Sequence, residues 1–191
     1  MAFRPNSGEI DIIEGGDAQS TDSITLHTSS GCVINNAGSQ AGTTTLTSDC
    51  NTENANTGCR VSTTNTNGYG TGFNNVGGGV YAIQWESSGI YIWFFQRGQI
   101  PLDITNGQPV TGNWGTPVVA FNGNASCNID SYFANNNIIL DTIFCGEWAG
   151  NVWGSSSCAS LASSCQNYVA ANPGAFTNVY WAINWVKVYQ Q

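Results

Sequence analysis

The stretch Glu9-Ile10-Asp11-Ile12-Ile13-Glu14 places three carboxylates within six residues and is flanked by glycines on both sides. The whole chain of 191 residues has only 12 acidic residues, and charged residues make up 8% of it, against about 25% in a typical soluble protein. A quarter of the acidic side chains therefore fall in one hexapeptide. The run is rich in β-branched isoleucine and is too short for a stable helix, so it predicts a strand.

Strict alternation along this strand would not put all three acidic side chains together. Glu9 and Asp11 would lie on one face of the strand and Glu14 on the other. A single β-bulge at Ile12-Ile13 adds one residue and restores the phase. We therefore predict a bulged strand whose three carboxylates share one face, while its isoleucines face a core.

Three carboxylates on one face repel one another, so at least one of them should have a pKa above its ordinary value. Retaining glycosidases need such a pair: a nucleophilic carboxylate and, roughly 5 Å away, a carboxyl that stays protonated and acts as general acid/base. The central Asp11 could share a proton with Glu9 and tune it. The competing interpretation of the same residues is a solvated acidic strand or a cation site.

The composition indicates one secreted domain, residues 1–191, with an uncharged polar surface. The net charge of -8 and the pI near 4.1 leave no basic patch for nucleic acid, and no apolar run is long enough to cross a membrane. The 7 Trp, 7 Tyr and 8 Phe residues, among many Asn, Thr, Ser and Gly, suit a neutral polyhydroxylated ligand. An ordinary β-protein with an aromatic core is the plainer alternative.

The seven cysteines are spaced too irregularly for a zinc site and lack histidine partners. They stand at positions 32, 50, 59, 127, 145, 158 and 165. We expect disulfides, hence an oxidising compartment, with one cysteine left unpaired. The sequon Asn124-Ala125-Ser126 points the same way. The first five residues contain no apolar segment of a signal peptide.

Short strand signals recur along the chain, with turns rich in Gly, Asn, Ser and Thr between them. The candidate strands are residues 10–14, 23–28, 80–86, 90–97, 118–121, 137–144 and 179–189. The pair 80–86 and 90–97 predicts a hairpin in which Gly89 can take a positive φ. One short helix is expected at 161–171, and a surface loop held by Cys50 and Cys59 at 37–75. Together these signals predict an antiparallel sandwich.

Five motifs, in order along the chain, carry a resemblance to a known family. They are the signature at residues 8–15, Thr25-Leu26-His27-Thr28, residues 80–97, residues 144–150 and residues 180–189. With these motifs the chain resembles the catalytic domain of glycoside hydrolase family 16, above all the fungal endo-β-1,3-glucanases of the laminarinase type.

The resemblance implies an all-β, concanavalin-like β-jelly-roll sandwich and a retaining double-displacement mechanism on β-1,3- or mixed β-1,3/1,4-glucan. It implies that Glu9 is the nucleophile, Glu14 the general acid/base, and Asp11 the residue that modulates the nucleophile. It implies no cofactor and no metal. The β-glucan polysaccharide or oligosaccharide is the expected partner, with neither nucleic acid nor membrane.

Three further residues are expected to contact the sugar. His27 would hydrogen-bond Glu14 or a sugar hydroxyl, and Trp148 and Trp114 would stack on sugar rings. Each has a plainer interpretation, because a lone histidine on a strand is often only a satisfied polar residue, and a tryptophan often belongs to the core. Glu147 stands where an Asp is usual, which changes the reach of the side chain but not its charge.

The family signature begins here at residue 8, whereas family members carry several jelly-roll strands before it. We therefore expect a domain that is incomplete at its N-terminus, with the odd cysteine's partner in the absent part. Three explanations stay open: a chain that starts at an internal Met, a fragment that associates with something else to cover the missing strands, or a pared-down variant with rebuilt edges. The expected location is extracellular or in the cell wall. A transglycosylase of the same family and a non-catalytic glucan-binding fragment are the alternative functions.

Overall fold

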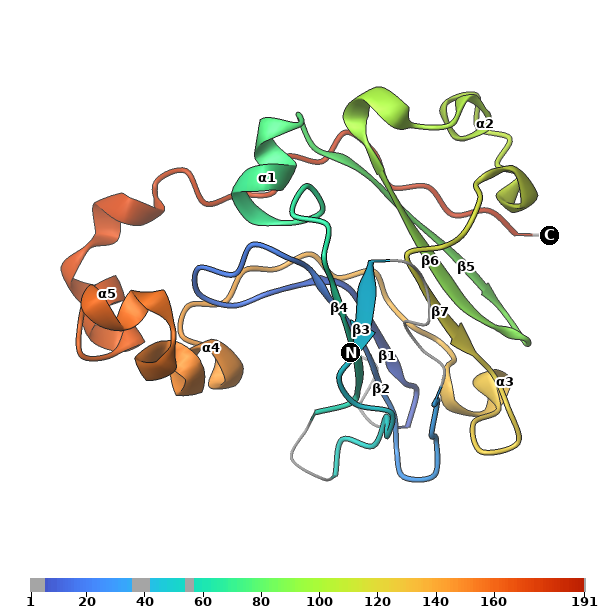
Figure 1. Ribbon diagram of the computed structural model, residues 1–191, viewed down its shortest axis with the longest axis horizontal. Helices are drawn as coiled ribbons and strands as arrows, with labels where there is room; N and C mark the ends of the chain where they lie inside the picture. The colour runs from blue at the N-terminus through green and yellow to red at the C-terminus, as the bar shows by residue number, and fades with distance from the viewer. Residues whose placement is uncertain (1–5, 36–41, 54–56, 191) are drawn as a thin grey trace. The chain divides into compact units, whose positions relative to one another are not determined.

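The computed structural model describes residues 6–35, 42–53 and 57–190 (Figure 1). The chain divides into two compact units. The first unit comprises the chain up to residue 15 and residues 19–137. The second comprises residues 16–18 and 138–191. The β-sheets, and with them the acidic hexapeptide, lie in the first unit.

The acidic hexapeptide forms the edge strand of an antiparallel four-stranded sheet. The strands are β1 (Glu9–Glu14), β2 (Ser23–His27), β3 (Thr43–Thr45) and β4 (Cys59–Thr63), and their order in the sheet is β1-β2-β4-β3. Strand β2 is buried along its whole length. It therefore forms the rigid support against which β1 is paired.

The register of β1 on β2 confirms the predicted bulge. Three acidic residues oppose three residues of β2: Glu9 opposite His27, Asp11 opposite Thr25, and Glu14 opposite Ser23. From the second pair to the third, β1 advances three residues while β2 advances two, so β1 carries one extra residue. The β2 partners are two residues apart and share a face, and directly paired residues lie on the same face. All three carboxylates therefore project from one face.

The second sheet contains the predicted hairpin. Strands β5 (Gly79–Glu86) and β6 (Gly89–Gln96) pair along their full length, and β7 (Val119–Asn122) pairs with β6. The expected positive φ at Gly89 was wrong, because this residue belongs to β6 and pairs with Glu86. Glycine fits there for another reason: a Cβ atom would lie 2.7 Å from the backbone oxygen of Phe121.

The two sheets pack on a common hydrophobic core, as in a sandwich. Fully buried members include Ile24 and Leu26 from the first sheet, and Ile90, Ile92 and Phe121 from the second. The isoleucines of β1 at positions 10 and 12 pack against the same cluster, as predicted. Because side chains alternate along each strand, the carboxylate face of the first sheet points away from this core.

The surface loop expected at residues 37–75 is wrong in part, because its described residues include β3, β4 and the helix α1 (Gly70–Asn75). Its two cysteines do pair, in the bridge Cys50–Cys59. The bridge anchors β4 at its first residue. The alternation that makes β4 a strand was hidden, since its buried positions are Cys59, Val61 and Thr63 rather than a run of large apolar residues.

The other disulfides are Cys32–Cys127 and Cys145–Cys165, and Cys158 is free. The predicted unpaired cysteine is thus confirmed. Three short helical turns lie between β6 and β7: η1 (Arg97–Gln99), α2 (Leu102–Thr105) and η2 (Thr111–Asn113). A fourth, α3 (Ile129–Tyr132), follows β7. No helix in the described ranges is long and apolar enough to cross a membrane.

The second unit contains short helices around one buried tryptophan. They are α4 (Glu147–Val152), η3 (Trp153–Ser155), η4 (Ser157–Ser160), α5 (Cys165–Ala171) and η5 (Pro173–Phe176). The helix expected at 161–171 is present but begins at residue 165, because the side chain of Ser164 caps it by accepting the Asn167 N–H. The ring of Trp153 is buried, and its Nε1 donates to the carbonyl of Ala162.

Two expected strands of the second unit, 137–144 and 179–189, do not form: no described residue pairs with them in a β-ladder. Both segments remain without regular structure, and many of their apolar side chains are exposed, for example Ile139 at 65% and Val188 at 72%. A strand exists only where a neighbour accepts and donates its backbone hydrogen bonds. The apolar pattern therefore gave a wrong prediction for both segments, because a pattern within one segment does not supply the neighbouring strand.

Gly58 offers a test of how the first sheet is held together. It has a φ of +63°, and a Cβ atom there would lie 2.5 Å from the backbone oxygen of Leu26 and 2.7 Å from Nδ1 of His27. We expect Gly58→Ala to lower the free energy of unfolding by at least about 1 to 2 kcal/mol from backbone strain alone. Urea unfolding measures this loss. Gly112→Ala is the matched control, because nothing lies within 4 Å of its Cβ position, and an equal effect of the two substitutions would contradict the account.

Candidate active site

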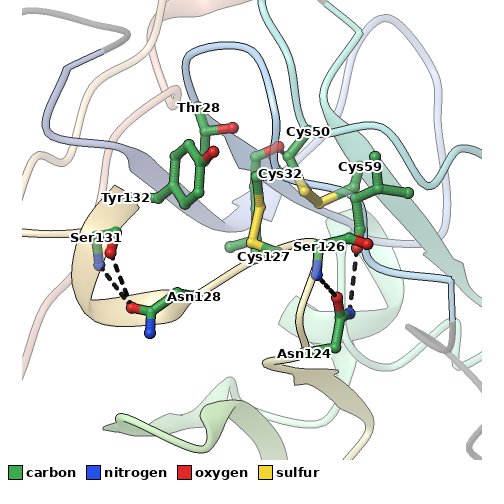
Figure 2. Close-up of a disulfide and its surroundings, with 12 residues drawn as sticks. Thr28, Cys32, Cys50, Cys59, Asn124, Ser126, Cys127, Asn128, Ser131 and Tyr132 are labelled. Atoms are coloured by element: carbon green, nitrogen blue, oxygen red, sulfur yellow. Dashed lines mark hydrogen bonds between the residues drawn. A yellow bond between two sulfur atoms is a disulfide. The ribbon is translucent and has the colours of Figure 1, made fainter.

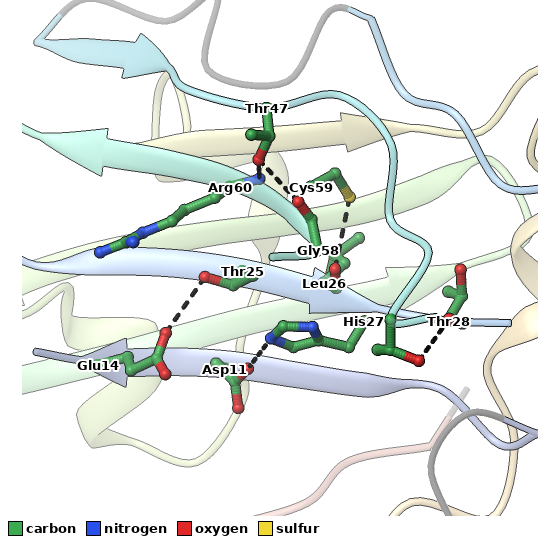
Figure 3. Close-up of polar contacts among 11 residues, drawn as sticks. Asp11, Glu14, Thr25, Leu26, His27, Thr28, Thr47, Gly58, Cys59 and Arg60 are labelled. Carbon is green, nitrogen blue, oxygen red and sulfur yellow. Dashed lines mark hydrogen bonds and ion pairs between the residues drawn. The ribbon is translucent and has the colours of Figure 1, made fainter. Parts of the chain in front are cut away.

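Asp11 and His27 are in contact at the centre of the carboxylate face (Figure 3). The distance from Nε2 of His27 to Oδ2 of Asp11 is 3.2 Å, and the side chain of His27 is only 7% exposed. The sequence predicted that His27 would contact Glu14 or a sugar hydroxyl. Its Nε2 instead faces Asp11, so its direct effect is on the central carboxylate.

Glu14 has the raised pKa that a general acid needs. Burial raises its pKa most, and the negative charge of Asp11 raises it further. The hydroxyl of Thr25, which donates to Oε2 of Glu14 over 3.2 Å, opposes this shift, as do the positive charges of His27 and Arg60. The prediction that one of the three carboxyls has a raised pKa is confirmed, but burial contributes more than the crowding of like charges.

Arg60 belongs to this face and was missed at the sequence level. It lies in β4 opposite Thr25 (Figure 3). Its Nη2 donates to the hydroxyl of Ser23 over 2.8 Å. Its positive charge limits the rise in the pKa of Glu14. The available signal was its rarity, since the chain has only 4 basic residues. That signal was lost because the segment around it was interpreted as a loop.

Asp22 is a second residue that the sequence did not single out. It is 0% exposed, and its Oδ1 accepts the backbone N–H of Glu14 over 2.9 Å. Burial raises the pKa of Asp22 from 3.8 to about 7, against the opposing effect of this hydrogen bond. Tyr81 lies close enough to Asp22 for the two groups to interact electrostatically. Its hydroxyl donates to the carbonyl of Gly68 over 2.8 Å. An acidic residue in a Ser- and Thr-rich turn gave no sequence signal of burial.

The raised pKa of Asp22 predicts a pH-dependent stability. The folded state favours its protonated form, so the contribution is complete below the unfolded pKa of 3.8 and disappears as the pH rises through about 7. We expect Asp22→Asn, which cannot ionise, to gain up to about 4 kcal/mol in unfolding free energy relative to the natural chain over this range. Urea unfolding at several pH values measures the difference. A difference that does not change with pH would contradict the assignment.

Glu9, Asp11 and His27 could also hold a cation, since each offers a ligand atom and the three atoms lie within 4.8 Å of one another. Such a site would not use Glu14, which is on the same face but is not one of the three candidate ligands. The raised pKa of Glu14 instead suits proton transfer.

The two candidate sugar-stacking residues lie in different units. Trp114 follows η2 in the first unit, where its Nε1 donates to Asp103 over 2.8 Å and its ring packs edge-on against Trp93 and Phe95. Those two aromatic residues lie on the face of β6 that points away from the core, so Trp114 is not brought together with the carboxylates. Trp148 lies half-buried in α4 of the second unit. A sugar contact remains a prediction for both.

A polar cavity of about 430 Å³ lies beside the Cys32–Cys127 disulfide (Figure 2). It is lined by residues 29–31, 125–128, Ser131 and Tyr132. Its lining offers hydroxyl and amide groups but no carboxylate or imidazole, so it lacks the pair of carboxyl groups that the β1 face presents. The carboxylate face of β1 and β2 is therefore the candidate catalytic site.

A comparison with sequence families gives a match over almost the whole chain. The model of the XgeA-like catalytic domain of glycoside hydrolase family 16 matches residues 2–189. A protein of Neosartorya fischeri named probable endo-1,3(4)-beta-glucanase is 46% identical over 97% of this chain and 29% of its own length. The endo-1,3(4)-beta-glucanase xgeA of Emericella nidulans is 41% identical over 97% of this chain and 30% of its own length. The chain thus spans about a third of the length of these relatives.

Solved structures resemble the chain as well. Laminarinase 16A from Phanerochaete chrysosporium, with beta-glucans in its donor and acceptor sites, superposes with a TM-score of 0.84 at 41% identity. The match covers 94% of this chain and 61% of that one. An elongating family 16 beta-1,3-glucosyltransferase superposes with a TM-score of 0.73 at 40% identity, over 83% of this chain and 52% of that one. The jelly-roll fold class expected from the sequence is thereby confirmed.

Proposed function

Because the chain belongs to glycoside hydrolase family 16, in its XgeA-like group, we propose that it carries a retaining endo-glucanase activity on β-1,3- or mixed β-1,3/1,4-glucan. One observation carries the proposal most directly: the bulge aligns Glu9, Asp11 and Glu14 on one face, and the pKa of Glu14 is raised. A nucleophile and a protonated acid on the same strand are the two groups that a double displacement requires.

In the first step, the carboxylate of Glu9 attacks the anomeric carbon and the glycosidic C–O bond breaks. The proton of Glu14 passes to the departing oxygen, so the leaving sugar departs as a neutral alcohol. Asp11 lies between the two on the strand and is paired with His27. In this position it raises the pKa of Glu14, and we assign to it the tuning of the nucleophile as well.

In the second step, Glu14, now ionised, takes a proton from water. The water oxygen bonds to the anomeric carbon, the ester bond to Glu9 breaks, and the original anomeric configuration is restored. Arg60 stabilises the ionised form of Glu14 and Asp11 disfavours it. The two opposing charges keep the carboxyl able to exist in both protonation states, as a residue that alternates between acid and base must.

The substrate follows from the relatives. Their names specify endo-1,3(4)-beta-glucanases, and the laminarinase holds beta-glucans in its donor and acceptor sites. We propose the same polysaccharide class here, with His27 acting through Asp11 and with Trp148 as a candidate stacking residue. Trp114 would stack only on a sugar bound away from the carboxylate face, because it packs on Trp93 and Phe95. The many uncharged polar side chains of this chain suit a neutral polysaccharide.

The test is to incubate the purified chain with laminarin, with mixed-linkage β-glucan and with cellulose, and to follow reducing ends. We expect reducing ends from the first two substrates, with a mixture of oligosaccharide lengths, and none from cellulose. Proton NMR at early times should show β-anomeric products, because two displacements retain configuration. α-anomers, or release of glucose alone, would contradict an endo-acting retaining enzyme.

Transglycosylation is a second candidate, favoured by the likeness to the elongating glucosyltransferase and by a mutant of laminarinase 16A that cyclizes laminariheptaose. In this reaction a sugar hydroxyl, instead of water, resolves the bond to Glu9. Mass spectrometry of the laminarin products separates the two functions. Oligosaccharides longer than the substrate, without a net gain of reducing ends, would favour the transferase.

Secretion and self-association complete the proposal. Three disulfides favour folding in an oxidising, extracellular environment. The exposed apolar residues at 179–189, among them Tyr180 at 73% exposure, favour association, since a soluble monomer rarely leaves such a patch uncovered. Light scattering on the purified chain measures the association.

A further inference from the structure

Asp22 occupies the point where the bulge of β1 ends and pairing with β2 resumes. A bulge interrupts the backbone ladder and leaves donors of the bulged strand without their usual partners. The N–H of Glu14 is the first amide after the two bulge residues, and the Oδ1 of Asp22 accepts it over 2.9 Å. A buried carboxyl thus makes the hydrogen bond that determines where regular pairing begins again.

The backbone of Asp22 is held in turn by a residue of β4. Its N–H donates to the hydroxyl of Thr63 over 3.2 Å, and its carbonyl accepts the N–H of Thr63 over 3.0 Å. Thr63 is the last residue of β4, so the anchor links β4 to the end of β1 through one residue. The side chain lies on the core side of β2, where Tyr81 of the second sheet neighbours it. It has little freedom to move.

We propose that Asp22 is a positioning residue for Glu14: by holding the amide that follows the bulge, it keeps the Glu14 carboxyl on the face shared with Asp11. A shift of the bulge by one residue would turn Glu14 toward the core, because neighbouring residues of a strand point to opposite faces. The expected effect on catalysis rests on the proposed function of Glu14. The expected effect on the position and pKa of the Glu14 carboxyl does not depend on that function.

Two substitutions separate the hydrogen bond from the charge. Asp22→Asn keeps an oxygen that can accept the Glu14 amide, whereas Asp22→Ala removes it. The first readout is the pH titration of the Glu14 carboxyl carbon by NMR, with the resonance assigned by its loss in Glu14→Gln. We expect the raised pKa of Glu14 to persist in Asp22→Asn and to rise further in Asp22→Ala, because burial, the largest cause of the raised pKa, increases when the carboxyl turns toward the core. If Asp22→Ala does not fold, Asp22→Ser, whose side chain is too short to reach the amide, replaces it.

The second readout uses two substrates that differ in their need for an acid. Laminarin has a poor leaving group that must be protonated, whereas the dinitrophenolate of 2,4-dinitrophenyl β-laminaribioside departs without a proton. For Asp22→Ala we expect kcat on laminarin to fall by about 10 to 100-fold with an unchanged KM. The initial burst of dinitrophenolate should stay within about twofold of the natural chain. Asp22→Asn should restore most of the laminarin activity.

Asp49→Ala is the matched control. Its Oδ1 also accepts a backbone N–H, that of Asn51, over 3.0 Å, but away from the carboxylate face. It should change neither readout. A folded Asp22→Ala variant that keeps the natural pKa of Glu14, or that loses activity equally on both substrates, would overturn the proposal. If the natural chain cleaves neither substrate, the proposed function fails, while the NMR titration still decides the role of Asp22.

Discussion

Glu9→Gln should abolish turnover of β-glucan. The amide is almost the same size as the carboxylate but cannot attack the anomeric carbon as an anion, so the glycosyl intermediate cannot form. We expect kcat to fall on the order of 10⁴-fold or more with little change in KM, because the loss lies in the transition state. Reducing-end assays on laminarin measure this effect.

The control for this prediction is Glu86→Gln, an exposed glutamate at the end of β5 that lies outside the carboxylate face. It should leave kcat unchanged. Circular dichroism and thermal melting show whether the variants fold. If a folded Glu9→Gln variant retains more than about a hundredth of the natural kcat, its role as nucleophile is wrong, because loss of an essential nucleophile leaves far less.

Glu14→Ala should produce a different defect, because it removes the acid/base and leaves the nucleophile in place. The expected loss in kcat on laminarin is about 10²- to 10⁴-fold, the usual contribution of general acid–base catalysis. On 2,4-dinitrophenyl β-laminaribioside the first step should survive and the second should become rate-limiting. Added azide, a small anion that needs no base, should then restore turnover and yield a β-glycosyl azide.

The anomer of that azide product distinguishes the mechanisms. A β-azide shows that azide replaced a covalently bound carboxylate on the opposite side of the sugar, as retention requires. An α-azide would indicate direct displacement and would contradict the assignment of Glu9. The natural chain should also lose activity as the pH rises through the raised pKa of Glu14, since only the protonated carboxyl can act as acid. Glu14→Ala should lack that pH dependence.

Much of the first unit could be predicted from local sequence pattern. The carboxylates fixed the position of the bulge, because only one extra residue between Asp11 and Glu14 brings the acids onto one face. The hairpin of β5 and β6 followed from two alternating apolar runs around a short turn. Strand β4 could not be predicted in this way, since its buried positions depend on the Cys50–Cys59 disulfide and on Thr63, whose hydroxyl accepts a distant amide.

The sequence predicted the part of the candidate site that lies on a single strand, but not the residues that other segments contribute. Glu9, Asp11 and Glu14 lie on one strand, and their arrangement follows from its period. Arg60 and Asp22 act on Glu14 across strands, so their contribution depends on a register that no single segment contains. The strands expected at 137–144 and 179–189 were wrong, because a strand forms only where a neighbour completes its backbone hydrogen bonds, and the described residues supply none.

The most direct test of the account is to trap the covalent intermediate. A 2-deoxy-2-fluoro-β-laminaribiosyl fluoride forms the ester quickly and releases it slowly, because fluorine destabilises the charged transition states while fluoride departs easily. Intact mass and peptide mapping after a short incubation should show one sugar per chain, attached to Glu9, and no adduct in Glu9→Gln. An adduct on another residue, or a chain that turns over laminarin without forming any, would contradict the central claim.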